Sequence, residues 1–235
     1  MTLNERLLKV QLNIEKALLS SGRAQSVKIV AATKTRDPNT INKTLYAGIV
    51  NIGENRIQEA EKKFNKVLKT KGVKKRFIGH LQSNKVNKCL DLFDTIDSIH
   101  SFKIAKKISK RLNITNKKIE CLIEVNTSGD KNKKGFAPNS LSEMVECVKV
   151  ENLNIKGLMT LGPQSQNPQK TRETFISLRS LLNDINKQTP NNRLGELSMG
   201  MSGDYIIAVE EGSTMVRLGT SLYGPRTQLL SLIHI

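Results

Sequence analysis

Apolar and polar positions along the chain follow two periods that alternate from one end to the other. Short apolar runs, typical of buried strands, are separated by longer segments in which apolar residues recur every three or four positions, as on one face of a helix. The runs predict strands over residues 27–33, 48–53, 76–80, 94–99, 119–126, 154–161, 195–199 and 214–219.

Helical spacing begins at the start of the chain and recurs between the predicted strands. Apolar residues at positions 3, 7, 10, 14 and 18 predict an amphipathic helix over residues 1–21. Asp37 and Pro38 suit the N-cap and first residue of a second helix, and Gly48 suits its end. Further stripes predict four more helices: Ile57, Ala60, Phe64 and Val67; Ile104, Ala105, Ile108 and Leu112; Leu141, Met144, Val145 and Val148; and Phe175, Leu178, Leu182 and Ile185.

This alternation of strands and helices determines the expected fold class. Strands that alternate with helices pair in parallel through right-handed crossovers. About eight such units in a chain of 235 residues predict an α/β protein with a single (β/α)8 TIM barrel. A doubly wound open sheet is the alternative, which the lack of a GxGxxG motif after any strand disfavours. No long Pro/Gly/Ser-rich linker divides the chain, so we expect one domain over residues 1–229, with helix 1–21 as an N-terminal addition.

Composition narrows the setting in which this barrel works. A hydrophobic content of 37% suits a globular core, and no apolar run approaches the roughly 20 residues that cross a bilayer. The first residues carry acidic side chains and helical periodicity, unlike a signal peptide. Three cysteines without a CxxC motif indicate reduced thiols. We therefore expect a cytoplasmic protein without a membrane partner.

The formal net charge of +17 raises the possibility of nucleic-acid binding. Only 4% of residues are aromatic, however, so platforms on which bases could stack are scarce. The basic residues also fall in many small clusters, such as 74–76 and 131–134, which are typical of solvated surfaces. Nucleic-acid binding is therefore the weakest functional alternative.

In a (β/α)8 barrel, chemistry takes place where strands end at their carboxyl termini. Lys34, Asn55 and His80 follow the first three predicted strands. Glycines gather in the last two loops, "SMGMSGD" (198–204) and "RLGTSLYG" (217–224). Glycine leaves backbone N–H groups approachable and a helix N-terminus adds partial positive charge, so these loops predict a phosphate site. Ser202 is also a candidate cap for the helix that follows it.

Lys34 stands between a buried strand and the start of a helix, on the same rim as the predicted phosphate site. An amine in this place suits an aldehyde cofactor that carries a phosphate, because burial lowers an amine's pKa and favours its nucleophilic form. Such a lysine forms a Schiff base with pyridoxal phosphate. The alternative is an ordinary surface lysine, one of 38 lysines and arginines in the chain.

Several long blocks resemble the pyridoxal phosphate homeostasis protein family, in order and over nearly the whole chain. They are "AATKTRDPNTI", "IGENRIQEA", "RFIGHLQSNK", "TIDSIHS", "EVNTSGDKNKKGF", "GLMTLGP", "LSMGMSGD" and "EEGSTMVRLGTSLYGPR". The resemblance implies the barrel seen in the N-terminal domain of alanine racemase. It also implies pyridoxal phosphate bound to Lys34, no catalytic turnover, and a role in storing the cofactor or delivering it, with apo-enzymes as potential recipients.

The resemblance further implies roles for individual residues. Ser202, Gly219 and Thr220 would hold the phosphate, Asn55 would lie beside the ring, and Arg217 would face the pyridine nitrogen. A cation there disfavours protonation of the ring and restrains carbanion chemistry, which suits a carrier. The alternative for Arg217 is a buried ion pair with Glu210 or Glu211. Neither a catalytic residue nor a metal site is expected.

An enzyme of the same barrel type, a racemase or decarboxylase, remains the main alternative function. The barrel-type racemases carry a further domain with a catalytic tyrosine. Here a second base would have to come from His80, Tyr205 or Tyr223, and none lies in a convincing motif. His100 is expected to be structural and Cys121 to belong to the core.

The last residues depart from the family pattern, which ends shortly after "YGPR". In one reading frame, the end of a transposon widely used for sequencing libraries encodes "LSLIHI", the last six residues here. We therefore expect residues 230–235 to be an artefact and assign no function to His234.

Overall fold

The computed structural model describes residues 1–165 and 167–225. Within these residues, eight parallel strands close into a barrel in chain order. Pairing of β8 with β1, with Ala31 opposite Leu218, completes the circle, so the predicted (β/α)8 barrel is confirmed and an open sheet is excluded. The strands are β1 Lys28–Ala32, β2 Asn51–Glu54, β3 Lys74–Phe77, β4 Thr95–Ile99, β5 Ile119–Glu124, β6 Leu153–Met159, β7 Glu196–Met201 and β8 Met215–Leu218.

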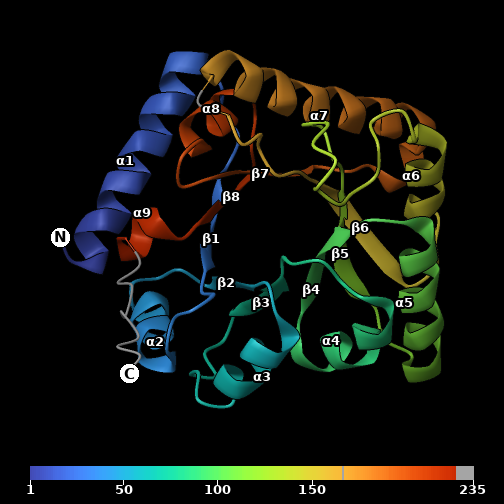
Figure 1. The fold of residues 1–235 in the computed structure, drawn as a ribbon, viewed down its shortest axis with the longest axis horizontal. Coiled ribbons are helices and arrows are strands. Elements are labelled where there is room, and N and C mark those ends of the chain that lie inside the picture. The colour runs from blue at the N-terminus through green and yellow to red at the C-terminus, as the bar shows by residue number, and fades with distance from the viewer. Residues whose placement is uncertain (166, 226–235) are drawn as a thin grey trace, which may run out of the picture.

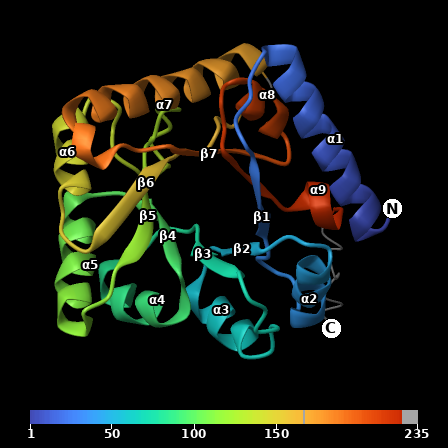
Figure 2. The ribbon, with the colours of Figure 1, turned by 180° about the vertical axis from the view of Figure 1, so that it is seen from behind.

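Helices surround this barrel as an outer ring (Figures 1 and 2). They are α1 Leu3–Ser21, α2 Pro38–Tyr46, α3 Ile57–Phe64, α4 Val86–Leu92, α5 Phe102–Thr115, α6 Leu141–Val148, α7 Pro168–Gln188, α8 Tyr205–Glu210 and α9 Thr220–Tyr223, with short 3-10 turns at Ser83–Lys85 and Pro190–Asn192. The five helices predicted from apolar spacing and the one predicted from its capping residues are all present. Helix α1 is the predicted N-terminal addition.

Local sequence explains where the first helices begin and end. The Thr2 side chain accepts a hydrogen bond from the Glu5 amide, and the Glu5 side chain accepts one from the Thr2 amide. Together these bonds form a capping box at the start of α1. Asp37 caps α2, accepting a hydrogen bond of 3.0 Å from the Thr40 amide, with Pro38 in the first turn. Gly48 follows this helix with a φ of 88°, as predicted for its end.

Most of the apolar core lies between the barrel and its helices. The predicted stripes face inward, and Ile108, Phe175 and Ile185 are fully buried. Cys121 is also in the core, as expected. Burying each large apolar side chain stabilises the fold by about 1.5–3 kcal/mol. A smaller apolar layer, formed by Val30, Leu122, Met159 and Met215, is a separate cluster of strand residues.

Helix α1 packs on the side of the barrel that contains β8, its last strand. Leu7, Val10, Ile14 and Ala17 form one cluster with residues of α8, β8 and α9. The Asn13 side chain donates a 2.8 Å hydrogen bond to the Tyr205 hydroxyl. The added helix thus supports the elements that carry the two glycine-containing loops.

The extent of a single domain over residues 1–229 stays a prediction. Residues 230–235 lie outside the described part of the chain. Among the described residues, no helix combines the length and apolar character that a membrane crossing requires.

Candidate functional site

Lys34 lies in a turn that begins directly after β1, and its side chain is partly buried. The following residue, Thr35, has a φ of 65°, an unusual left-handed conformation for a residue with a side chain. Asn55 occupies the corresponding place after β2. The backbone after β3 packs so closely on Asn55 that a Cβ on Gly79 would lie 2.2 Å from the Asn55 carbonyl oxygen. Only glycine fits there, and it brings the ends of these strands together.

The two glycine-containing loops meet at Ser202. Its Oγ accepts hydrogen bonds from the backbone N–H groups of Gly219, at 3.2 Å, and Ser221, at 3.1 Å. The Ser221 hydroxyl in turn donates to the Ser202 carbonyl. A Cβ added to Gly219 would have only Ala32 atoms near it, at 3.9 Å, and Thr220 is exposed. Two backbone donors therefore converge on one point beside open space.

This arrangement corrects one expectation for Ser202. The N-cap of α8 is Asp204, and the Ser202 hydroxyl binds the other loop instead of capping that helix. The Asp204 carboxylate accepts a 2.5 Å hydrogen bond from the Met201 amide. Ser202 was therefore wrongly interpreted as a helix cap.

Arg217 is buried inside the barrel, with 4% of its surface exposed. One terminal nitrogen donates to the carbonyl and hydroxyl oxygens of Ser198, at 2.8 and 2.7 Å, and the other donates to the Thr160 carbonyl at 2.7 Å. Burial lowers the pKa of Arg217 from its ordinary value, against the influence of nearby carboxylates. A guanidinium nevertheless remains charged in proteins. The site therefore contains a fixed cation held by neutral acceptors.

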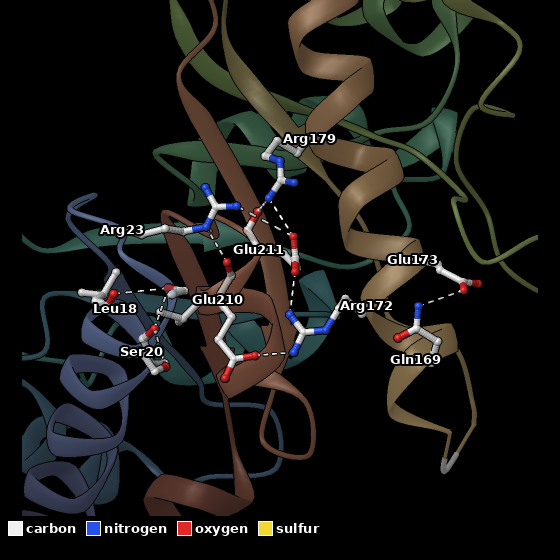
Figure 3. A network of polar contacts seen from close by, with 12 residues as sticks. Leu18, Ser20, Arg23, Gln169, Arg172, Glu173, Arg179, Glu210 and Glu211 are labelled. Atoms are coloured by element: carbon white, nitrogen blue, oxygen red, sulfur yellow. Dashed lines mark hydrogen bonds and ion pairs between the residues drawn. The ribbon is translucent and has the colours of Figure 1, made fainter.

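The alternative partners proposed for Arg217 lie elsewhere. Glu210 and Glu211 end α8 and face arginines of α7 (Figure 3). Arg172 contacts both carboxylates, at 2.5 and 2.6 Å, and Arg179 contacts Glu211 at 2.7 Å. The alternative of an ion pair between Arg217 and either glutamate is therefore excluded, because these glutamates instead tie the end of α8 to α7.

Glu124, at the end of β5, is a buried carboxylate that sequence reasoning missed. Only 6% of the surface of this residue is exposed, and its Oε2 atom has no hydrogen-bond partner within the described structure. Burial raises the pKa of Glu124, and the charge of Arg217 opposes that rise only in part. Its place at the end of an apolar run was visible in the sequence, but its lack of a partner depends on the fold.

A second group that sequence reasoning missed surrounds the turn of Lys34. Lys63 of α3 is almost fully buried and forms an ion pair of 2.5 Å with Glu54, the last residue of β2. The sequence signal was Glu59 four residues before Lys63 in a helical segment, a spacing that places the two side chains together.

The residues considered as a second base have other contacts. The Tyr205 hydroxyl accepts from Asn13 on the α1 side. Tyr223 makes a 3.0 Å hydrogen bond with Thr44, and burial raises its pKa to about 12. The rings of His80 and His100 lie 4.3 Å apart, and burial lowers the pKa of both. Among the described residues, His, Cys, Asp and Glu side chains form no group of three or more suited to a metal ion.

Residues 10–227 match the family described as alanine racemase, N-terminal domain. The pyridoxal phosphate homeostasis protein of Aquifex aeolicus is 39% identical over 224 residues, which span 94% of this chain and 97% of that protein. The chain belongs to the pyridoxal phosphate homeostasis protein family. The relative in Schizosaccharomyces pombe is 33% identical over 229 residues, covering 94% of both chains.

Solved structures agree with this family assignment. PipY of Synechococcus elongatus, without pyridoxal phosphate, superposes with a TM-score of 0.86 at 30% identity and covers 95% of this chain and all of PipY. PipY with pyridoxal phosphate bound has a TM-score of 0.82 at 29% identity, covering 95% of this chain and all of that one. Alanine racemase of Clostridium difficile has a TM-score of 0.71 at 16% identity, covering 95% of this chain but 56% of the racemase. The last likeness shows the shared barrel fold.

Proposed function

We propose that this protein binds pyridoxal 5'-phosphate at the carboxyl-terminal mouth of its barrel, attached to Lys34, and serves in homeostasis of the cofactor. The observation that carries this function is the convergence of two backbone donors beside the turn of Lys34. Register between β1 and β8 places Ala31 opposite Leu218, so the residues that follow each strand, Lys34 and Gly219, end on the same rim.

The residues at this rim fit the phosphate end of the cofactor. The amides of Gly219 and Ser221 already donate to one oxygen, Ser202 Oγ. The absence of a Cβ at Gly219 leaves room for further oxygens. We propose that Ser202, Gly219 and Thr220 hold the phosphate, with the Thr220 hydroxyl as an additional donor.

The amine and the arginine fit the other end. Pyridoxal phosphate supplies an aldehyde and an electron-withdrawing pyridine ring. Lys34 attaches the aldehyde by forming a carbon–nitrogen double bond with loss of one water molecule. We propose that Arg217 faces the ring nitrogen and keeps it unprotonated, and that Asn55 lies beside the ring. Three hydrogen bonds to Ser198 and Thr160 hold the guanidinium in place for this role.

We further propose that the protein stores or delivers the cofactor and does not turn over a substrate. Tyr205 and Tyr223 are engaged with Asn13 and Thr44, and the raised pKa of Tyr223 makes it a poor base near neutral pH. The names of the relatives, which specify homeostasis, support the same role. Potential recipients are apo-enzymes that use the cofactor. Three buried free cysteines support a reducing compartment, the cytoplasm.

The test is to load the purified protein with pyridoxal phosphate and offer it separately to an apo-enzyme and to a panel of L-amino acids. We expect the apo-enzyme to gain activity, while the amino acids keep their chirality and release no carbon dioxide above background. Turnover that is lost in a Lys34→Ala variant would contradict the carrier function and favour a racemase or decarboxylase.

A further inference from the structure

Lys63 is a buried lysine whose side-chain nitrogen contacts three oxygen atoms. One belongs to Thr33, the residue before Lys34, and the other two belong to glutamates that contact the residues on either side of Lys34. Its Nζ donates to the backbone carbonyl of Thr33 at 2.9 Å. It also contacts Glu54 at 2.5 Å and Glu59 at 2.9 Å. The Lys63 side chain is 7% exposed, so water competes little for these contacts.

The two glutamates extend these contacts to both sides of Lys34. Glu54 Oε1 accepts a 2.6 Å hydrogen bond from the hydroxyl of Thr33, the residue before Lys34. Glu59 Oε1 accepts a hydrogen bond from the backbone N–H of Thr35, the residue after it. Both neighbours of Lys34 in the chain are therefore bound to one cluster, formed by the buried Glu54 and Lys63 and the partly exposed Glu59.

The backbone at Lys34 needs such support. Thr35 has a φ of 65°, a left-handed conformation that a β-branched residue adopts only when its surroundings enforce it. The Glu59 contact holds the N–H of this residue, and the Lys63 contact holds the carbonyl on the other side. Because the cluster spans β2 and α3, it fixes the turn of Lys34 relative to the neighbouring strand.

We infer that Lys63, through Glu54 and Glu59, is a positioning residue that holds Lys34 in the orientation for attachment of an aldehyde. This inference rests on the proposed function of Lys34. Lys63 itself acts through the backbone of Thr33, which its ammonium group binds. The ammonium also compensates the charge of Glu54, which is fully buried and whose Oε2 lacks a partner among the described residues.

Two consequences of removing Lys63 can be separated. Lys63→Met strands the Glu54 carboxylate in the interior and releases the Thr33 carbonyl. The double variant Lys63→Met/Glu54→Gln removes the stranded charge but still lacks the donor to Thr33. A role limited to stability predicts that the double variant recovers fully. A positioning role predicts that it recovers stability while Lys34 stays impaired. Lys62→Met, at an exposed lysine of the same helix, is the matched control.

The experiment measures Lys34 in two ways. Trace acetic anhydride labels lysines of the protein without cofactor, and the rate at the Lys34 peptide is followed against pH. Borohydride trapping after mixing with pyridoxal phosphate gives the rate of attachment. In Lys63→Met we expect attachment to slow about tenfold or more, since small misplacements of a reacting group have large effects. We also expect acetylation at the Lys34 peptide to differ in rate from wild type, because the turn that carries Lys34 has lost its contact from Lys63 to the Thr33 carbonyl.

The outcomes are distinct. The inference is supported if Lys62→Met attaches the cofactor at the wild-type rate and both Lys63 variants attach it slowly. The slow attachment must persist in the double variant although its melting temperature recovers. Attachment that recovers together with stability, or Lys63→Met behaving like Lys62→Met, overturns it. If trapping in the wild-type protein labels a lysine other than Lys34, the proposed function fails, and this result is independent of the acetylation profiles.

Discussion

Two buried arginines in the barrel differ in the groups that compensate their positive charge. Arg76 of β3 lines a cavity of about 200 Å³ with the first residues of several strands, among them Lys28 and Lys74. It binds both carboxylate oxygens of Asp97, at 2.8 and 3.3 Å. Arg217 of β8 instead donates to the neutral oxygens of Ser198 and Thr160. Within the described chain, Arg76 has an ion-pair partner and Arg217 has none.

The difference lies in where each positive charge is compensated. The Asp97 carboxylate neutralises Arg76 inside the protein, so that guanidinium contributes to the fold alone. Arg217 is held by three hydrogen bonds to neutral oxygens, and nearby carboxylates act on its charge without forming an ion pair with it within the described residues. Under the proposed function, this charge acts on the cofactor. The two lysines at the ends of β1 differ in their settings. Lys28 at its start is half-exposed and pairs with Glu196, whereas Lys34 follows its end in a turn whose Thr35 amide is bound by Glu59.

The largest effect is expected at the neutralised arginine. Arg76→Met leaves the fully buried Asp97 carboxylate without its cation, so the free energy of unfolding should fall by about 3–5 kcal/mol. Chemical denaturation measures this loss. Lys28→Met, which breaks the exposed ion pair with Glu196, is the control and should change stability by less than about 1 kcal/mol. Equal effects of the two substitutions would contradict the contrast between a buried and an exposed charge.

The next largest effect is expected in the loop over residues 217–224, which we propose to bind the phosphate of the cofactor. Gly219→Val crowds the backbone donors of Gly219 and Ser221. We expect pyridoxal phosphate affinity to fall roughly 10- to 100-fold, since one hydrogen bond to a charged group contributes about 1.5–3 kcal/mol. Thr220→Val removes only one hydroxyl with little change in volume, so its loss should be smaller. Equilibrium dialysis gives both affinities. Wild-type affinity in both variants would refute the placement of the phosphate.

Arg217→Met should destabilise the protein less than Arg76→Met does. It removes the donors from the Ser198 and Thr160 oxygens, although the Ser198 carbonyl keeps its hydrogen bond from the Thr160 amide at 3.1 Å. It strands no directly paired carboxylate, so we expect a loss of about 1–2 kcal/mol. Pyridoxal phosphate should nevertheless bind less tightly, whereas the folded fraction of Arg76→Met should bind it normally. Cofactor titration of both variants measures these affinities. Tighter binding by Arg217→Met than by Arg76→Met would contradict the distinction between the two arginines.

The smallest effect concerns the unpartnered carboxylate near Arg217. Burial raises the pKa of Glu124 in the folded state above its unfolded value, so folding loses stability as pH rises through the folded pKa. Glu124→Gln should therefore melt at a higher temperature than wild type at pH 8, by roughly 2–4 °C. The gap should close as the pH falls toward the ordinary pKa of glutamate, because the Glu124 carboxyl of the wild type then becomes protonated and neutral, like the glutamine amide of the variant. A gap that instead widens with acidification would show that the carboxylate is stabilised in the fold.

The fold could be predicted because its determinants are local. Strands of a parallel barrel are buried on both faces and form apolar runs, and caps such as Asp37 with Pro38 mark helix starts. The order of elements then leaves few topologies. The place of Lys34 followed from the same reasoning, since any residue directly after β1 must lie on the rim.

The details of the site depended on contacts between residues distant in sequence. Ser202 looks like a helix cap until β7 and β8 place it against Gly219 and Ser221. Glu210 and Glu211 lie a few residues before Arg217 in the chain. In the structure, however, their side chains contact Arg172 and Arg179. No prediction was made for Lys63 from the sequence, because only the packing of α3 against β2 reveals that it is buried. Such pairings follow from tertiary packing rather than local pattern.

The central claim is that Lys34 carries pyridoxal phosphate. The most direct measurement is to mix the wild-type protein with one equivalent of the cofactor, reduce with borohydride, digest and identify the modified peptide by mass spectrometry. We predict a single major adduct on Lys34, with Lys28, at the opposite end of β1, unmodified. A major adduct on any other lysine, or none after reduction, would contradict the account.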